Sequence, residues 1–253
     1  MLTDEQLLRY NRQIMMHDFD VAGQERLARA SVLIVGLGGL GSAASMYLAA
    51  AGVGRLLLAD GDTVELSNLQ RQIVHQQQSL GSNKAKSAAQ SLARLNPELE
   101  LRVISSDLDE AALPALLQGV DLVVDCTDQY AVRFALNRSC IAAAIPMVSG
   151  AAVRSEGQCA VFHPARAGGC YRCLYPQSGA QGALSCSESG VLAPMVGVIG
   201  AMQAMEAIKC LAGYGQSLLG QLMVLDLASL EVRRIRLPRR PECPDCSHLP
   251  GQD

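Results

Sequence analysis

The sequence predicts an α/β fold: a Rossmann-like, mostly parallel sheet flanked by helices. Two observations support this prediction. Short β-branched runs alternate with helical segments from residue 31 to about residue 150, which is typical of parallel strands joined by right-handed crossovers. A cluster of glycines also follows the first run, at the turn from strand to helix where such folds bind phosphates.

Composition and charge narrow the class of protein. The chain has 253 residues, 49% of them hydrophobic, so we expect one large domain with a sizeable core. The net charge is −3 without a basic tract, which argues against nucleic-acid binding. The polar start does not look like a signal peptide, and the apolar run at residues 191–202 is too short to span a bilayer. Nine cysteines without a secretion signal favour metal ligands and free thiols in a reducing cytoplasm. We therefore expect a cytoplasmic protein that does not bind a membrane.

The first elements lead into the glycine cluster. Thr3 and Gln6 form a capping box for a helix to about residue 16, and a second short helix at 23–30 precedes the strand at 32–35. Glycines then fit the Gly-x-Gly-x-x-Gly spacing, with one extra glycine inside it, and the helix at 42–51 follows; these glycines are Gly36, Gly38, Gly39 and Gly41. The spacing predicts a nucleotide bound through backbone N–H groups at the start of a helix.

Charged residues follow three successive strands. Asp60 ends the strand at 56–59, where an acid suits hydrogen bonds to a ribose hydroxyl. In the polar loop that follows, Arg71 lies just past two helix-start residues, Ser67 and Asn68. Lys84 lies in the first turn of the next helix, where the helix dipole disfavours a cation and so indicates an anion nearby. Asp128 follows a buried strand at 121–125.

Together these residues indicate a particular nucleotide. Arg71, Lys84 and Asp128 suit a triphosphate and a magnesium ion. A P-loop is excluded, because no Gly-Lys-Ser/Thr ending follows the glycines. An NAD-dependent dehydrogenase remains an alternative, because the glycines and Asp60 fit that class of enzyme as well. A non-enzymatic nucleotide-binding adaptor is a further alternative.

Hydrophobic periodicity, together with residues that start and stop helices, predicts the remaining helices and strands. Helices are predicted where apolar residues recur between start and stop signals, at 84–95, 109–117, 129–144 and 191–211. Strands are predicted at 101–104, 146–149 and 158–162, with a hairpin from 221–227 and 232–237. A polar loop at 174–190 contains Cys186.

Two Cys-x-x-Cys pairs predict a metal site. Cys170 and Cys173 form one pair, and Cys243 and Cys246 form the other. Four thiolates with this spacing favour a structural Zn²⁺ in tetrahedral coordination. Such a site would connect the end of the chain to its second half.

The chain resembles the ubiquitin-activating-enzyme-like adenylyltransferases over nearly its whole length. The matching segments are Arg-Tyr-Asn-Arg-Gln (9–13), Gly-Leu-Gly-Gly-Leu-Gly (36–41), Asp-Gly-Asp-Thr-Val (60–64), Ser-Asn-Leu-Gln-Arg-Gln (67–72), Asp-Cys-Thr-Asp (125–128), Val-Ser-Gly-Ala-Ala (148–152) and both cysteine pairs. The resemblance is greatest to the branch that serves molybdenum cofactor biosynthesis. It implies a mixed sheet of about eight strands, a homodimer, and ATP with Mg²⁺. It also implies adenylation of the C-terminal Gly-Gly carboxylate of a small ubiquitin-like sulfur carrier, the small subunit of molybdopterin synthase, with release of pyrophosphate.

The resemblance also implies domains and roles. The chain would be one ATP-binding adenylyltransferase domain, with N-terminal helices at 1–30, a nucleotide-binding half at 31–150 and a zinc- and carrier-binding half at 151–253. The nucleotide would contact Gly36, Gly38, Gly39, Gly41, Asp60, Ser67, Asn68, Gln70, Arg71, Lys84, Asp128 and Gln129. Catalysis would use Asp128, Arg71, Lys84 and an Arg12 supplied by the other subunit.

Three features of the sequence qualify these implications. Gln129 stands where relatives usually have Asn, which changes one expected nucleotide contact. Cys186 matches a cysteine that forms covalent adducts in some relatives, but an enzyme that only adenylates does not need it. No rhodanese-like domain follows Cys246, so we do not expect this chain to carry the sulfur. A carrier of the thiamine pathway, or a small-molecule carboxylate, is the alternative substrate.

Overall fold

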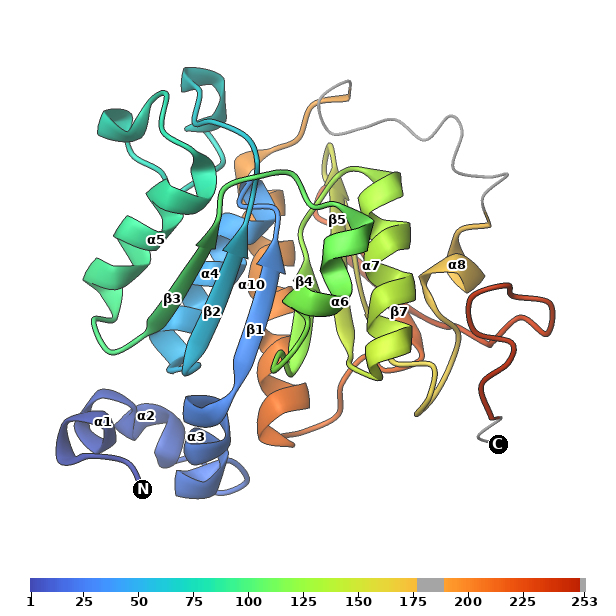
Figure 1. Cartoon of the computed structure of the whole chain (residues 1–253), viewed down its shortest axis with the longest axis horizontal. Helices are drawn as coiled ribbons and strands as arrows, with labels where there is room; N and C mark the ends of the chain where they lie inside the picture. Colours follow the sequence, from blue (N-terminus) through green and yellow to red (C-terminus); the bar gives the residue numbers. More distant parts are fainter. Residues whose placement is uncertain (177–188, 251–253) are drawn as a thin grey trace.

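Eight strands form one mixed sheet in a computed structural model of the chain, which describes residues 1–176 and 189–250 (Figure 1). The strand order is β3-β2-β1-β4-β5-β6-β7-β8. The first five strands of this order are parallel, and β6, β7 and β8 are antiparallel to their neighbours. The strands are β1 (Ser31–Val35), β2 (Arg55–Ala59), β3 (Glu100–Ile104), β4 (Leu122–Asp125), β5 (Met147–Val153), β6 (Glu156–Phe162), β7 (Gln221–Asp226) and β8 (Glu231–Arg236). The eight-stranded α/β sheet expected from the sequence is confirmed.

Helices cover both faces of the sheet. Successive β1 side chains point to opposite faces: Val32 and Ile34 join a core with α4, α5 and α10, whereas Leu33 and Val35 join a core with α6, α7 and α8. The α-helices are α1 (Asp4–Arg9), α2 (Asn11–Ile14), α3 (Asp20–Arg29), α4 (Gly39–Ala51), α5 (Lys84–Leu95), α6 (Leu113–Leu116), α7 (Tyr130–Ala143), α8 (Tyr171–Leu174) and α10 (Ala193–Ala212). Short 3-10 turns are η1 (Leu66–Asn68), η2 (Gln77–Ser79) and η3 (Glu110–Ala112).

Three predicted helices differ from the structure. The N-terminal helix has its predicted capping box but breaks at Tyr10, whose buried hydroxyl accepts a hydrogen bond of 3.0 Å from Asn96 Nδ2. Ser67 and Asn68 do not begin an α-helix; they belong to η1, a 3-10 helix of one turn. The helix predicted at 109–117 is η3 followed by one turn, α6, with a proline near its start.

The apolar helix α10 packs against α4 and β5 in the core. The run at 191–202, which is too short by itself to span a bilayer, covers only the first part of this helix; the whole helix, with 20 residues and an apolar window of mean hydropathy 1.4, is long and apolar enough to cross a membrane by length and composition alone. Half of the apolar window is buried inside the protein, as in a core helix.

The strand order creates a crevice between β1 and β4. From β1 the chain continues to β2 on one side and later places β4 on the other, and open α/β sheets bind ligands at such a switch point. The loop after β1 needs glycine here. Gly36 has a φ of +87°, and a Cβ on Gly41 would lie 1.9 Å from the Gly36 carbonyl oxygen. The glycines therefore bring the start of α4 to the mouth of this crevice.

Candidate active site

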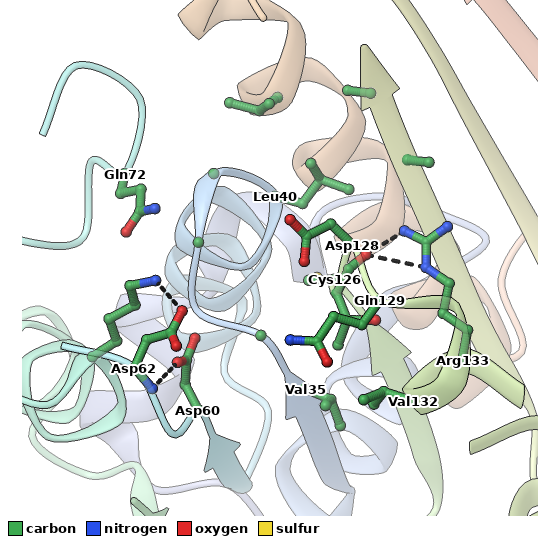
Figure 2. Close-up of a pocket in the computed structure, with 18 of the residues that line it drawn as sticks. Val35, Leu40, Asp60, Asp62, Gln72, Cys126, Asp128, Gln129, Val132 and Arg133 are labelled. Atoms are coloured by element: carbon green, nitrogen blue, oxygen red, sulfur yellow. Dashed lines mark hydrogen bonds and ion pairs between the residues drawn. The ribbon is translucent and has the colours of Figure 1, made fainter. Parts of the chain in front are cut away.

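A cavity of about 1040 Å³ opens at the carboxyl ends of β1, β2 and β4 (Figure 2). Most of the predicted nucleotide-site residues line it. They are Gly36, Gly38, Gly39, Asp60, Asn68, Arg71, Lys84, Asp128 and Gln129. Residues separated by nearly 100 positions thus meet at one end of the sheet.

Four predicted residues are not among the described residues that line the cavity. Gly41 allows the tight turn of the glycine loop, in which a Cβ atom would not fit, and the side chains of Ser67 and Gln70 are exposed. Arg12 lies at the other end of the sheet, on α2 (Figure 1). Its neighbour Gln13 donates a hydrogen bond to the carbonyl of Ala51, at the end of α4 opposite the glycine loop. A helix of 13 residues spans about 20 Å, so Arg12 is far from the cavity of its own chain.

Asp60 holds the glycine loop in place. One carboxylate oxygen accepts a hydrogen bond from the backbone N–H of Leu37 at 2.7 Å, and the other accepts from Asp62 N–H at 2.9 Å. Burial raises the pKa of Asp60 and the bond from Leu37 opposes that rise. Each carboxylate oxygen can accept a second hydrogen bond, so Asp60 can still bind a hydroxyl group in the cavity.

The anion expected near Lys84 is a side chain of the protein. Lys84 begins α5, and its Nζ lies 2.8 Å from Oδ2 of Asp62. The lysine side chain is 9% exposed, whereas that of Asp62 is 71% exposed. Arg71, which also lines the cavity, donates to the Ser67 carbonyl at 3.1 Å. An anionic ligand would therefore meet two cations, one of them already paired with an exposed carboxylate.

Asp128 presents an exposed carboxylate to the cavity. Figure 2 shows it across the glycine loop from Asp60 and Asp62. The loop that carries it is fixed by the fully buried Asp125, whose Oδ1 accepts from the backbone N–H and hydroxyl of Thr127. The other oxygen of Asp125 accepts from the Ser149 hydroxyl at 2.6 Å. Of the two acids at this strand end, one is structural and the other is available to a ligand.

Three buried polar side chains beside the cavity were not predicted. Gln72 lies beside Gly38, and its Oε1 is buried without a hydrogen-bond partner among the described residues. His75 joins the glycine loop to α5, and Arg133 supports the loop after β4. The only signal in the sequence for Arg133 is a charge inside the buried face of α7.

The cavity continues past the nucleotide-site residues. Ala151 and Val153 of β5 line this part, together with Glu156, Gln158 and Tyr175. Gln158 donates a hydrogen bond from Nε2 to the Tyr175 hydroxyl. The extension leaves room for a second ligand beside one bound at the glycine loop.

The two cysteine pairs meet in a single cluster. The Sγ atoms of Cys170, Cys173, Cys243 and Cys246 all lie within 4.8 Å of one another. The separations of 3.6 Å for Cys170–Cys243 and 3.5 Å for Cys173–Cys246 are near the roughly 3.8 Å edge of a tetrahedron with Zn–S bonds of about 2.3 Å. A hydrogen bond to Cys173 and burial raise the pKa of Cys170 far above its usual range. Cys170, Cys243 and Cys246 are buried and Cys173 is half-buried. Four thiolates this close together need a cation to balance their charge, and the donor set fits Zn²⁺.

Cys186, the candidate for a covalent adduct, lies outside the described residues. Cys126, Cys140 and Cys159 are buried, and burial raises the pKa of each thiol. These three thiols are therefore unreactive at neutral pH.

Comparison with known proteins places the chain in a family. The ThiF family matches residues 10–245. Molybdopterin-synthase adenylyltransferase from Escherichia coli (strain K12) is 52% identical over 245 residues, covering 97% of this chain and 98% of the relative. Adenylyltransferase and sulfurtransferase MOCS3 from Sus scrofa is 45% identical over 251 residues, covering 98% of this chain but 55% of the relative. A crystal structure of E. coli MccB with ATP is 25% identical with a TM-score of 0.83, covering 94% of this chain and 74% of that one. The chain belongs to the ThiF family.

Proposed function

We propose that this protein is an adenylyltransferase that activates the small sulfur-carrier subunit of molybdopterin synthase, in molybdenum cofactor biosynthesis. The observation that carries the proposal is the cavity, in which a glycine loop, two cations and an exposed aspartate meet at the switch point of the sheet. Similarity to molybdopterin-synthase adenylyltransferases over 97% of the chain supports the choice of substrate.

The reaction needs little covalent chemistry from the protein. A carboxylate oxygen at the carrier's C-terminal glycine attacks the α-phosphorus of ATP. The bond from that phosphorus to the oxygen bridging to the β-phosphate breaks, and pyrophosphate leaves. The carboxylate is already a nucleophile, so no catalytic base is required. The protein's task is to position the two substrates and to neutralise charge.

The lining residues divide this task. The glycine loop and the start of α4 hold the nucleotide, and Asp60 accepts a hydrogen bond from a ribose hydroxyl. Arg71 and Lys84 face the phosphates, with Lys84 exchanging Asp62 for phosphate oxygens; the exposure of Asp62 makes that exchange inexpensive. Asp128 would hold Mg²⁺, which would neutralise charge on the phosphates.

Three further features belong to the proposal. The protein acts as a homodimer in the cytoplasm, Arg12 completes the cavity of the partner subunit, and the four-cysteine cluster holds a structural Zn²⁺. The extended part of the cavity, along Ala151 and Val153 of β5, receives the Gly-Gly end of the carrier.

ATP–pyrophosphate exchange with purified carriers tests the proposal. We expect exchange with the molybdopterin-synthase small subunit, and none when its two C-terminal glycines are removed. Calorimetry should show Mg²⁺-dependent binding of ATP and no binding of NAD. Exchange that responds only to the thiamine-pathway carrier would reassign the substrate, and tight NAD binding without any exchange would overturn the enzyme class.

A pair of variants tests the assigned roles. Asp128→Ala should lower exchange by about 100-fold or more, because losing the metal ligand removes several kcal/mol of transition-state stabilisation. Cys186→Ala should leave exchange nearly intact, since no covalent step precedes the adenylate. A folded, ATP-binding Cys186→Ala enzyme without exchange would show that the thiol acts earlier.

A further inference from the structure

Arg133 holds the loop that carries Asp128 from behind. Nε and Nη2 of its guanidinium both donate to the carbonyl of Thr127, the Nε bond being 3.1 Å (Figure 2). That carbonyl belongs to the planar peptide unit that joins Thr127 to Asp128. Fixing its oxygen therefore fixes the backbone from which the Asp128 carboxylate extends.

The same guanidinium reaches the neighbouring strand. Nη2 donates to the carbonyl of Gly150 on β5 at 2.9 Å, and Nε lies 3.6 Å from Oδ2 of Asp125. Gly150 directly precedes Ala151, which lines the extended part of the cavity. Arg133 thus ties the proposed magnesium side of the cavity to the proposed carrier side.

A second set of contacts connects Arg133 to the cysteine cluster. Nη1 of Arg133 lies 3.4 Å from the hydroxyl of Tyr171, a fully buried residue between Cys170 and Cys173. The backbone N–H of Tyr171 donates to Asn137 Oδ1, and Asn137 Nδ2 donates to Asp245, between Cys243 and Cys246; both bonds are 2.9 Å. Both cysteine pairs are therefore fastened to α7, the helix that carries Arg133.

We infer that Arg133 is a positioning residue for Mg²⁺ binding at Asp128, and that the Tyr171 hydroxyl anchors its guanidinium to the four-cysteine cluster. The inference rests on the proposed function, which places Mg²⁺ at Asp128. The planar fork of an arginine can hold two carbonyl oxygens at fixed angles, whereas a lysine supplies the same charge without that geometry. The role accordingly depends on the shape of the guanidinium as well as on its charge.

Three variants test the inference. Arg133→Lys keeps the charge and loses the fork, and Tyr171→Phe removes only the hydroxyl. Arg138→Gln is the matched control, because Arg138 lies on the same helix and pairs with the exposed Glu110. For each variant we would measure the Mg²⁺ concentration for half-maximal pyrophosphate exchange, ATP affinity by calorimetry with and without Mg²⁺, zinc content and thermal unfolding.

Arg133→Lys should raise the Mg²⁺ requirement by about 10-fold or more, the usual effect of losing a residue that orients a metal ligand. Zinc content and Mg²⁺-free ATP affinity should not change. Tyr171→Phe should shift the Mg²⁺ requirement in the same direction by less, and Arg138→Gln should not shift it.

A wild-type Mg²⁺ requirement in folded, zinc-loaded Arg133→Lys overturns the inference, even if the maximal rate falls. If Arg133→Lys does not fold, Tyr171→Phe decides in the same way. If no carrier supports exchange in the wild-type protein, the proposed function fails. The Mg²⁺ dependence of ATP affinity, compared across the three variants, then still tests Arg133.

Discussion

His75 connects the glycine loop to α5 through both nitrogens of its ring. Nε2 lies 2.9 Å from the Leu37 carbonyl, and Nδ1 lies 2.9 Å from the Ser87 hydroxyl. A carbonyl can only accept, so Nε2 carries the hydrogen, and Nδ1 of the neutral ring accepts from Ser87. Burial lowers the pKa of His75 below its ordinary value, and Lys84 adds to the effect. The glycine loop is therefore built around a neutral histidine.

This arrangement predicts an acid limit for stability and ATP binding. As the pH falls below about 6.5, the unfolded chain takes up a proton at His75 that the folded chain resists. The free energy of unfolding should therefore decrease from that pH down to the lower pKa of the folded state. His75→Gln, which keeps a donor for the Leu37 carbonyl, should weaken this dependence, as measured by urea unfolding between pH 5 and 8.

His163 provides the matched control for His75. Burial also lowers the pKa of His163, but this residue lines a second cavity away from the nucleotide site. His163→Gln should flatten part of the stability profile and leave the pH dependence of ATP binding unchanged. If His75→Gln binds ATP with the wild-type pH dependence, His75 does not hold the glycine loop in the way described.

Position along the chain made some site residues predictable. Asp60 and Asp128 follow strand ends, and Lys84 begins a helix, so sequence alone places them at the carboxyl edge of the sheet. His75 and Arg133 could not be found in this way. His75 contacts the Leu37 carbonyl and the Ser87 hydroxyl, and Arg133 reaches from α7 to the Gly150 carbonyl on β5. These groups come within reach only when the elements pack.

Elements were predictable where propensity and packing agree. The buried β-branched strands β1 and β4 lie where they were expected. The strand predicted at 146–149 instead continues as β5 to Val153, because β6 pairs with it from Met147 to Val153. Glycine and alanine at 150–152 are weak strand formers, and tertiary pairing overrides that preference.

The C-terminal segment has a defined structure that its own secondary-structure propensity does not explain. Between Leu237 and Leu249 it forms turns, and Cys243 and Cys246 pack with Cys170 in a small separate core. A metal bound only in the folded state contributes its binding free energy to stability. The cluster therefore explains how a segment without a helix or strand stays in place.

Zinc removal tests this explanation. Elemental analysis should find one zinc per chain, and Cys243→Ser should lose it. The melting temperature of Cys243→Ser should fall by more than the roughly 2–4 °C that 1 kcal/mol represents for a chain of this size. Cys210→Ala, at a half-buried thiol outside the cluster, should keep its zinc. Metal-free protein with an unchanged melting temperature would exclude a structural zinc.

For the whole molecule, the alternating pattern predicted the parallel part of the sheet but not the part after residue 150. The strands β6, β7 and β8 were predicted from their own residues, at 158–162 and as a hairpin at 221–227 and 232–237, but their place in the same sheet was implied only by the family resemblance. The proposed active site also depends on the whole assembly, because the partner subunit would supply Arg12. Leu8 and Met15, on or next to the N-terminal helices, are each 73% exposed, so apolar side chains are available there for the proposed contact with a partner subunit.

The proposed partner contact can be tested by subunit complementation. Arg12 is exposed on α2 and lies about a helix length from its own glycine loop. An arginine supplied to reacting phosphates can be worth on the order of 10³-fold in rate. Arg12→Ala and Asp128→Ala homodimers should therefore each be nearly inactive in pyrophosphate exchange.

Refolding the two variants together distinguishes a partner's arginine from the chain's own. In a two-fold dimer, a mixed pair has one cavity with an intact Asp128 and an intact Arg12 from its neighbour, while the other cavity lacks both. About half of randomly formed dimers are mixed, so exchange should return to about a quarter of the wild-type rate. If Arg12 served its own cavity, every cavity of a mixed dimer would carry one defect, and activity would not return. Mixed dimers confirmed by mass but without activity would therefore rule out Arg12 acting across the interface.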